Sequence, residues 1–131
     1  MITGECFCGS IRYEIDCALT DAKCCHCSQC RKMFGSASSA YAQIEDPKQF
    51  QWVSGEEQLK QYMSKHGWGI GFCGECGSTL CGIFDATVKG VTLGTINGDP
   101  GIEITKHIFV NSKASWDHIG GTAPQYSEWD T

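Results

Sequence analysis

The sequence predicts a small, mainly β protein in which clustered cysteines bind metal. Three observations lead to this expectation: apolar residues alternate over short spans, helical segments are scarce, and the 131 residues include 10 cysteines and 16 glycines. A chain of this length is typical of one domain with its own core. We therefore expect residues 1–131 to form a single domain of short antiparallel strands with one or two helical turns.

The strand-like segments are short, and turn-forming pairs such as Asn-Gly and Asp-Pro occur between them. Alternation of apolar residues with polar residues or glycine is typical of strands that bury one face. Such alternation occurs at residues 11–16, 40–44, 50–52, 68–72 and 91–95, and an apolar run follows at residues 108–110. This spacing favours antiparallel sheets.

Two short helices are expected. Residues 28–34 can form one or two helical turns, and Gly35 is placed to end them. Asp46 followed by Pro47 has the order of a helix cap and a first helical residue, which predicts another single turn. Neither segment is long enough to define the fold.

Composition excludes several classes of partner. The net charge is −5, and no run of lysine and arginine is present, so we expect neither nucleic acid nor an anionic membrane surface as a partner. No apolar run approaches the ~20 residues of a membrane span. The first ten residues, MITGECFCGS, lack the features of a signal peptide. We expect a cytoplasmic protein, whose thiols stay reduced and serve metal binding or catalysis rather than disulfides.

Two cysteine pairs predict a closed zinc site. Cys6 and Cys8 precede one strand-like segment, Cys73 and Cys76 follow another, and a glycine comes after each pair. Zinc in structural sites takes four protein ligands in a tetrahedron, and close spacing lets one loop supply two of them. We expect these four cysteines to hold a structural zinc. The alternative is two unrelated buried pairs.

A second group lies in the segment CCHCSQCRK, residues 24–32. The sulfurs of Cys25, Cys27 and Cys30 can turn toward one point, whereas Cys24 and His26 should face elsewhere. Three protein ligands leave one position of a tetrahedral ion open, as in catalytic zinc sites. The alternative is a second structural site, completed by Cys24, Cys81 or a histidine.

The charge of the second group suggests its chemistry. Zinc with three thiolates carries a formal charge of −1, which suits a soft fourth ligand better than an activated water. An external thiol bound there would be deprotonated and remain nucleophilic. Arg31 and Lys32 follow directly; they either offset this charge, bind a substrate carboxylate, or lie on a solvated surface.

Four segments together carry a family resemblance: GECFCGSIRYEI, CCHCSQCRKMFGS, FCGECGSTL and HIFVNSKASW. In this order and spacing the sequence resembles the glutathione-dependent formaldehyde-activating enzymes. The resemblance implies a β-rich fold of the Mss4-like, or β-tent, type. It implies structural zinc ligands at Cys6, Cys8, Cys73 and Cys76, and catalytic zinc ligands at Cys25, Cys27 and Cys30, with two zinc ions per chain.

The resemblance also implies an activity. The chain would act as a carbon–sulfur lyase similar to S-(hydroxymethyl)glutathione synthase, with glutathione or another small thiol and formaldehyde or a related aldehyde as partners. Two alternatives are a non-catalytic zinc scaffold or glutathione carrier, and a thiol oxidoreductase. The last would need a reactive thiol among the three unassigned cysteines. The four histidines are candidates for proton transfer, although a structural role is expected for each. The unassigned cysteines and the histidines are Cys17, Cys24, Cys81, His26, His66, His107 and His118.

Overall fold

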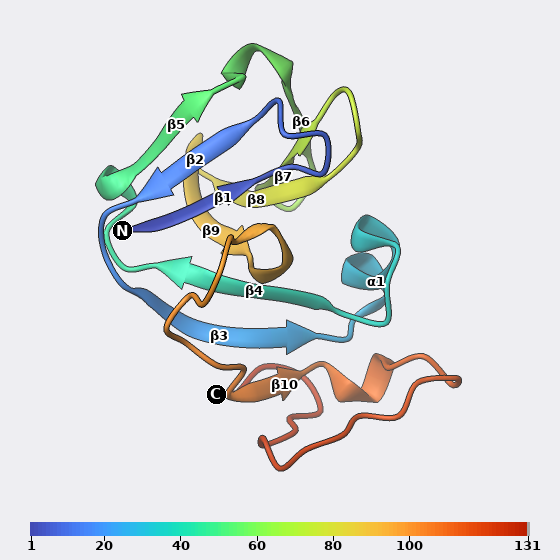
Figure 1. Cartoon of the computed structure of the whole chain (residues 1–131). Coiled ribbons are helices and arrows are strands. Elements are labelled where there is room, and N and C mark those ends of the chain that lie inside the picture. Colours follow the sequence, from blue (N-terminus) through green and yellow to red (C-terminus); the bar gives the residue numbers. More distant parts are fainter. Residues whose placement is uncertain (131) are drawn as a thin grey trace. The chain divides into compact units, whose positions relative to one another are not determined.

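A computed structural model describes residues 1–130, which form two compact units (Figure 1). Unit 1 consists of Met1–Thr20 and Ala42–Ile102. Unit 2 consists of Asp21–Tyr41 and the segment that begins at Glu103. The mainly β character expected from the sequence is confirmed. That the whole chain behaves as a single domain stays a prediction.

One sheet of unit 1 is antiparallel, with the strand order β1-β2-β5. Tyr13 on β2 is 1% exposed, and its ring stacks on Phe50 at 5.4 Å between centroids. The Tyr13 ring also occupies the space where a side chain at Gly4 would lie, only 2.1 Å from the position of a Cβ. Glycine is therefore required on β1 at this point. The strands are β1 Ile2–Glu5, β2 Arg12–Ile15 and β5 Phe50–Ser54.

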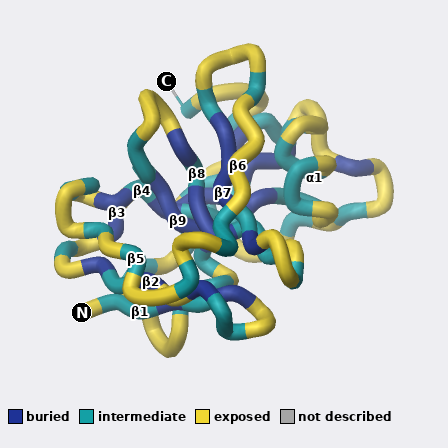
Figure 2. The backbone as a smooth tube through the Cα atoms, turned by 90° about the horizontal axis from the view of Figure 1, so that it is seen from above, coloured by how far each residue is buried: buried dark blue, intermediate teal, exposed yellow. Residues whose placement is uncertain are grey.

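The other strands of unit 1 form consecutive antiparallel hairpins in the order β9-β8-β7-β6. The middle of β7 and half of the residues in each of β8 and β9 are buried, whereas β6 is largely exposed (Figure 2). The core thus forms where apolar residues of adjacent strands meet. The strands are β6 Leu59–Met63, β7 Trp68–Cys73, β8 Thr79–Phe84 and β9 Thr87–Thr92, and the single-turn 3-10 helices of this unit are η1 Pro47–Gln49, η2 Glu56–Gln58 and η3 Leu93–Thr95.

In unit 2, strand β3 lies between β4 and β10 (Figure 1). β10 runs parallel to β3, with His107 opposite Cys24. The chain leaves β3 directly into helix α1 and later passes along β4 into unit 1. The elements are β3 Leu19–Cys25, α1 Ser28–Phe34, β4 Ser39–Ile44, β10 Lys106–Ile108 and the 3-10 helix η4 Val110–Ser112.

A cluster of four charged side chains links β3 to β10 and to Asp130. The ammonium of Lys23, whose side chain is only 7% exposed, contacts a carboxylate oxygen of Asp21 at 2.5 Å. Asp21 also pairs with Lys106 of β10 at 2.5 Å, and Lys106 pairs in turn with Asp130. A buried lysine needs such a partner, because an unpaired charge in the interior is costly.

Both expected helices are confirmed. Helix α1 spans Ser28–Phe34 and ends at Gly35, whose φ of 58° is the left-handed conformation that glycine adopts readily. Asp46 caps η1, and its carboxylate accepts a hydrogen bond from the Lys48 amide. Local capping chemistry was sufficient to place these two elements.

The strand predictions need three corrections. Residues 93–95 form η3 rather than the end of a strand, and Val110 begins η4 rather than ending β10. The pairing of β10 with β3 is parallel, so the sheets are not wholly antiparallel. Strands β1, β3, β6 and β8 were not predicted, because apolar–polar alternation is weak or absent in them. Among residues 1–130, no helix combines the length and the apolar character that a membrane crossing requires.

Candidate metal centres

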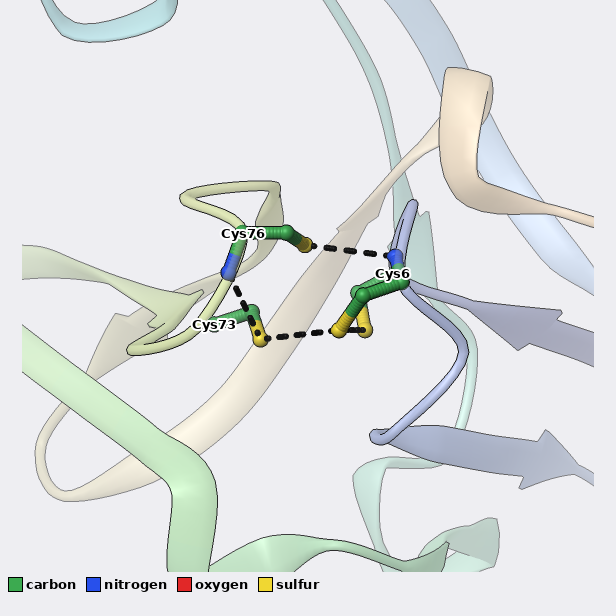
Figure 3. A group of neighbouring side chains, drawn as sticks. Cys6, Cys73 and Cys76 are labelled. Atoms are coloured by element: carbon green, nitrogen blue, oxygen red, sulfur yellow. Dashed lines mark hydrogen bonds between the residues drawn. The ribbon is translucent and has the colours of Figure 1, made fainter.

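The first cysteine group lies in unit 1 and is built from two loops. Cys6 and Cys8 come from the loop after β1, whereas Cys73 ends β7 and Cys76 lies in the turn that follows. Figure 3 shows Cys6 facing Cys73 and Cys76 across the space between these loops. All four sulfur atoms lie within 4.8 Å of one another. We call this set of four cysteines the closed group.

The spacing of the sulfurs in the closed group fits a tetrahedral metal ion. The Cys6 and Cys8 sulfurs are 3.6 Å apart, and the Cys8 and Cys73 sulfurs are 3.8 Å apart. Four sulfurs at a zinc–sulfur distance of about 2.3 Å would be about 3.8 Å from one another. No disulfide joins them, since all ten cysteines are free thiols. The donor set therefore suits a soft divalent ion such as zinc.

Backbone amides surround the closed group and point at its sulfurs. The Ile11 amide donates to the Cys6 sulfur at 3.3 Å, and the Cys8 amide donates to the Cys76 sulfur at 3.5 Å. The Cys73 sulfur accepts from the amides of Glu75 and Cys76 at 3.4 and 3.5 Å. Such bonds stabilise negative charge on sulfur and fix the direction of each ligand.

Two serine hydroxyls complete this surrounding shell. The Ser10 hydroxyl lies 3.1 Å from the Cys8 sulfur, and the Ser78 hydroxyl lies 3.2 Å from the Cys76 sulfur. The Ser78 hydroxyl also accepts a hydrogen bond from the amide of Phe7, at 2.9 Å, and so links the two loops. Hydrogen bonds from the Ser78 hydroxyl and from backbone amides lower the pKa of Cys76 to about 5, against the opposing effect of burial.

These serines were missed in the sequence, although a signal for them exists. The tripeptide Cys-Gly-Ser occurs at residues 8–10 and again at residues 76–78. Each copy places a glycine with positive φ, 78° at Gly9 and 81° at Gly77, between the ligand and the hydroxyl. The repeated tripeptide thus encodes the same turn twice, once for each loop.

The second cysteine group lies in unit 2 and comes from one continuous segment. Cys25 ends β3, Cys27 is the N-cap residue of α1, and Cys30 lies in the first turn of that helix. Their three sulfurs lie within 4.8 Å of one another. Cys25 is 4% exposed, whereas Cys27 and Cys30 are half-buried. We call these three cysteines the open group.

Helix formation itself positions the open group. The Cys27 sulfur accepts a hydrogen bond from the Cys30 amide at 3.3 Å, so a thiol takes the capping role usually filled by an oxygen. A hydrogen bond with Cys25 lowers the pKa of Cys30 to about 6, against the effect of burial, and the same interaction raises the pKa of Cys25. Of these two thiols, Cys30 is therefore the more readily ionised.

His26 points away from the open group and into a buried hydrogen bond. It is 3% exposed, and its Nε2 lies 3.0 Å from Nδ1 of His107. Its amide donates to the carbonyl of Ile108 at 3.0 Å, and its Nδ1 lies 3.7 Å from a carboxylate oxygen of Asp117. Burial and His107 lower the pKa of His26. His26 thus fixes the loop between Cys25 and Cys27 to β10.

The other expected residues lie outside both groups. Within the described part of the chain, neither group contains a histidine or any of Cys17, Cys24 and Cys81. Burial raises the pKa of Cys24, and it raises the pKa of Cys81 to about 12. Cys81 is 1% exposed and behaves as a small apolar residue of the core.

Comparison with known proteins agrees with this arrangement. A crystal structure of a protein from Rhodobacter sphaeroides is similar, with a TM-score of 0.58 and 27% sequence identity; the match covers 74% of this chain and 89% of that chain. No curated protein matches the sequence. The family model described as glutathione-dependent formaldehyde-activating enzyme matches residues 1–112, which include both cysteine groups. The chain therefore belongs to the glutathione-dependent formaldehyde-activating enzyme family.

Proposed function

We propose that the protein is a zinc-dependent carbon–sulfur lyase that forms and breaks the adduct of a small thiol, such as glutathione, with formaldehyde. The observation that carries this proposal is the open group, which offers three thiols where the closed group offers four. Family membership supports the same reaction class. Three protein ligands are the arrangement of catalytic zinc sites, and four are that of structural sites.

The two groups have different roles in this proposal. Cys6, Cys8, Cys73 and Cys76 hold a structural zinc that joins two loops of unit 1. Cys25, Cys27 and Cys30 hold a catalytic zinc and are the residues on which catalysis depends. A zinc ion held by three thiolates would bind an incoming thiol and keep it ionised at neutral pH.

The reaction balances without a further reagent. The thiol sulfur forms a bond to the carbonyl carbon of formaldehyde, and the electrons of the carbonyl π bond move to its oxygen. The proton lost by the thiol ends on that oxygen, which gives a hydroxymethyl thioether. The reverse direction breaks the same carbon–sulfur bond and returns thiol and aldehyde.

Tyr41 is the residue we propose as hydrogen-bond donor to the reacting oxygen. Residues two apart in a strand share one face of the sheet. Tyr41 therefore lies on the same face of β4 as Ser39. Lys23 likewise lies on the same face of β3 as Cys25. The Lys23 ammonium lies 5.5 Å from the centre of the Tyr41 ring, and Ser39 helps to lower the pKa of Cys30. Since Ser39 contacts Cys30, and since charge on Cys25 and Cys30 acts on Tyr41, Tyr41 lies beside the open group in this proposal.

The state of the Tyr41 hydroxyl suits that role. Burial raises its pKa, and negative charge on Cys25 and Cys30 raises it further. The hydroxyl consequently stays protonated throughout the neutral range and can donate to an oxygen on which charge develops. An ionised Tyr41 could only accept a hydrogen bond and would not stabilise that oxygen.

The thiol-oxidoreductase alternative finds less support. It needs an uncoordinated cysteine with a lowered pKa. Burial raises the pKa of both Cys24 and Cys81, which makes these thiols poor nucleophiles. A scaffold or carrier function remains the competing outcome of the experiment below.

The test is exchange of formaldehyde between its hydrate and S-(hydroxymethyl)glutathione, followed by NMR at equilibrium with zinc-loaded protein. The proposal predicts faster exchange than in the protein-free mixture, and loss of that acceleration in Cys27→Ser. Cys17→Ser is the matched control, because Cys17 lies outside both groups. A protein that binds two zinc ions and accelerates nothing would be a scaffold or carrier, and the proposed activity would be wrong.

A further inference from the structure

We propose that Arg31 binds a carboxylate of the thiol substrate, so that this enzyme selects anionic thiols over neutral ones. The inference rests on the proposed function, since it concerns the substrate of the open group. Three features of unit 2 support it: the place of Arg31 on α1, the surroundings of its guanidinium, and the charge of the neighbouring thiols.

The first feature is the helical position of Arg31. It follows Cys30 directly and lies four residues after Cys27, whose carbonyl accepts a hydrogen bond from the Arg31 amide at 3.0 Å. Residues four apart share one face of a helix, and helical side chains lean toward the N-terminus. We therefore expect the Arg31 side chain to extend back toward the first turn of α1, where Cys27 is the cap residue. Lys32, one residue later, lies on another face and is exposed.

The second feature is an unpaired donor. The Nε atom of Arg31 is buried and has no hydrogen-bond partner, and no carboxylate of residues 1–130 forms an ion pair with this arginine. A buried donor without a partner costs free energy, which a ligand oxygen would recover. The Nε–H donor of Arg31 is thus unused within the described part of the chain.

The third feature is electrostatic. Three thiolates with a divalent ion carry a net charge of −1 and repel an anionic substrate, so such a substrate needs a cation beside the group. Arginine presents a planar fork of donors that matches a carboxylate with two parallel hydrogen bonds. Glutathione carries two carboxylates, and 2-mercaptoethanol carries none.

The simpler alternative is that Arg31 only offsets the charge of the cysteines. The two roles predict different results. An arginine that only offsets charge acts through that charge alone, so Arg31→Lys, which keeps the charge, should behave like wild type toward every thiol. An arginine that binds a carboxylate affects only thiols that have one.

The experiment measures binding as well as rate, with zinc-loaded protein. Calorimetry compares S-methylglutathione with its diethyl ester, which has the same skeleton without carboxylate charge. Wild type should bind the acid roughly tenfold or more tightly than the ester, as a charge-assisted pair requires. Arg31→Gln should bind both equally. Lys32→Gln is the matched control and should keep the wild-type preference, because it removes the same charge from an exposed neighbour.

Rates of formaldehyde exchange give the second measurement. Arg31→Gln should lower kcat/KM for glutathione roughly tenfold or more and leave that for 2-mercaptoethanol unchanged. Arg31→Lys keeps the positive charge but lacks the planar fork of donors. Its kcat/KM for glutathione should therefore lie between those of wild type and Arg31→Gln. Zinc content and thermal unfolding of each variant establish that the fold is intact.

Several outcomes would overturn the inference. One is a wild-type protein that binds neither compound, or that binds the acid no more tightly than the ester. Another is an equal loss of the preference for the acid in Arg31→Gln and Lys32→Gln. A third is an equal loss of kcat/KM for glutathione and for 2-mercaptoethanol in Arg31→Gln. The proposed reaction fails separately: binding that depends on Arg31 in a protein that exchanges no formaldehyde would leave the carboxylate site standing and remove the lyase activity.

Discussion

The two cysteine groups differ in how far apart in sequence their ligands lie. The closed group joins Cys6 and Cys8 to Cys73 and Cys76, so it links loops separated by about half the chain. The open group takes all three cysteines from the six residues between Cys25 and Cys30. A metal in the closed group therefore restrains the fold of unit 1, whereas a metal in the open group restrains only one strand end and one helical turn.

The surroundings of the two groups differ in the same direction. Four backbone amides and two serine hydroxyls lie within hydrogen-bonding distance of the sulfurs in the closed group. In the open group the Cys30 amide contacts the Cys27 sulfur, the Cys27 amide contacts Cys25, and the Ser39 hydroxyl contacts Cys30. Hydrogen-bonded, fourfold coordination suits permanent retention of a metal, and threefold coordination with fewer donors suits exchange of a fourth ligand. The proposed function thus gives a structural role and a catalytic role to different cysteines.

The largest effect is expected from a break in the closed group. Cys76→Ser should reduce the zinc content from two ions to one and lower the free energy of unfolding by on the order of 10 kcal/mol, because binding energy at a structural site is folding energy. Zinc analysis and thermal unfolding measure both quantities. Cys17→Ser should match wild type in each. A Cys76→Ser protein that unfolds like wild type would refute the structural role.

The next effect concerns the open group and leaves metal and fold in place. Tyr41→Phe should lower kcat for formaldehyde exchange by about a hundredfold, the usual cost of losing a donor to a developing oxyanion. Both zinc ions and the thermal unfolding midpoint should be retained. Tyr62→Phe is the control, since Tyr62 is 58% exposed on β6 of unit 1. Equal rates in Tyr41→Phe and wild type would remove Tyr41 from the reaction.

A smaller effect tests whether hydrogen bonds to the sulfurs strengthen metal retention in the closed group alone. Ser78→Ala removes a hydroxyl 3.2 Å from the Cys76 sulfur and should weaken zinc at the closed group about tenfold, as loss of a hydrogen bond to a ligand does. Competition with a chelator measures this affinity. The first zinc released should come from the open group, and its affinity should be unaffected. Ser112→Ala, a change at an exposed residue of η4, should alter neither step. Parallel weakening of both ions by Ser78→Ala would contradict the separation of the two groups.

The smallest effect tests whether charge pairs stabilise unit 2 independently of metal. Burial opposes ionisation of Asp21, but hydrogen bonds from Lys106 and Lys23 outweigh it and lower the Asp21 pKa. Hydrogen bonds to Asp130 and Asp21 raise the pKa of Lys106. The Asp21 contribution is therefore complete above the ordinary aspartate pKa of about 3.9 and is lost as the pH falls below it. The Lys106 contribution persists up to the ordinary lysine pKa of about 10.4 and is lost above it.

Asp21→Asn should lower the free energy of unfolding by about 1 kcal/mol at neutral pH, a modest value because the Asp21 side chain is 35% exposed and partly screened. The difference from wild type should shrink as the pH falls below about 4. Urea unfolding at the two pH values measures it. A difference that grows at low pH would show that the pair is not what stabilises unit 2.

Local sequence patterns predicted the parts of the fold that depend on neighbouring residues. Asp46, Pro47 and Gly35 placed both helical segments because capping is a short-range effect. Strands with a clear alternation, such as β7, were also found. β6 was missed because it is largely exposed on both faces and has no apolar period. The parallel pairing of β10 with β3 depends on contacts between segments about eighty residues apart, which periodicity does not encode.

The same distinction holds for the site. Cysteine spacing predicted the open group and each pair of the closed group, because short spacings confine several sulfurs to one loop. That the two distant pairs meet was inferred from the four ligands that structural zinc requires. The hydrogen bond between His26 and His107 was not predicted, since it depends on the register of β10 beside β3. The position of Tyr41 beside the open group likewise follows from the neighbouring strands β3 and β4. Residues that support a site from another element are visible only once the strand order is known.

The most direct test of the central difference is cadmium NMR of protein in which both metal ions are replaced by cadmium. Two resonances are expected, one from four sulfur ligands and one from three. Addition of glutathione should shift the second resonance toward the position of the first and leave the first unchanged, and Cys27→Ser should lack the shifting resonance. Two resonances that both show fourfold sulfur coordination before glutathione is added, and that do not respond to it, would contradict the open group and with it the proposed enzyme.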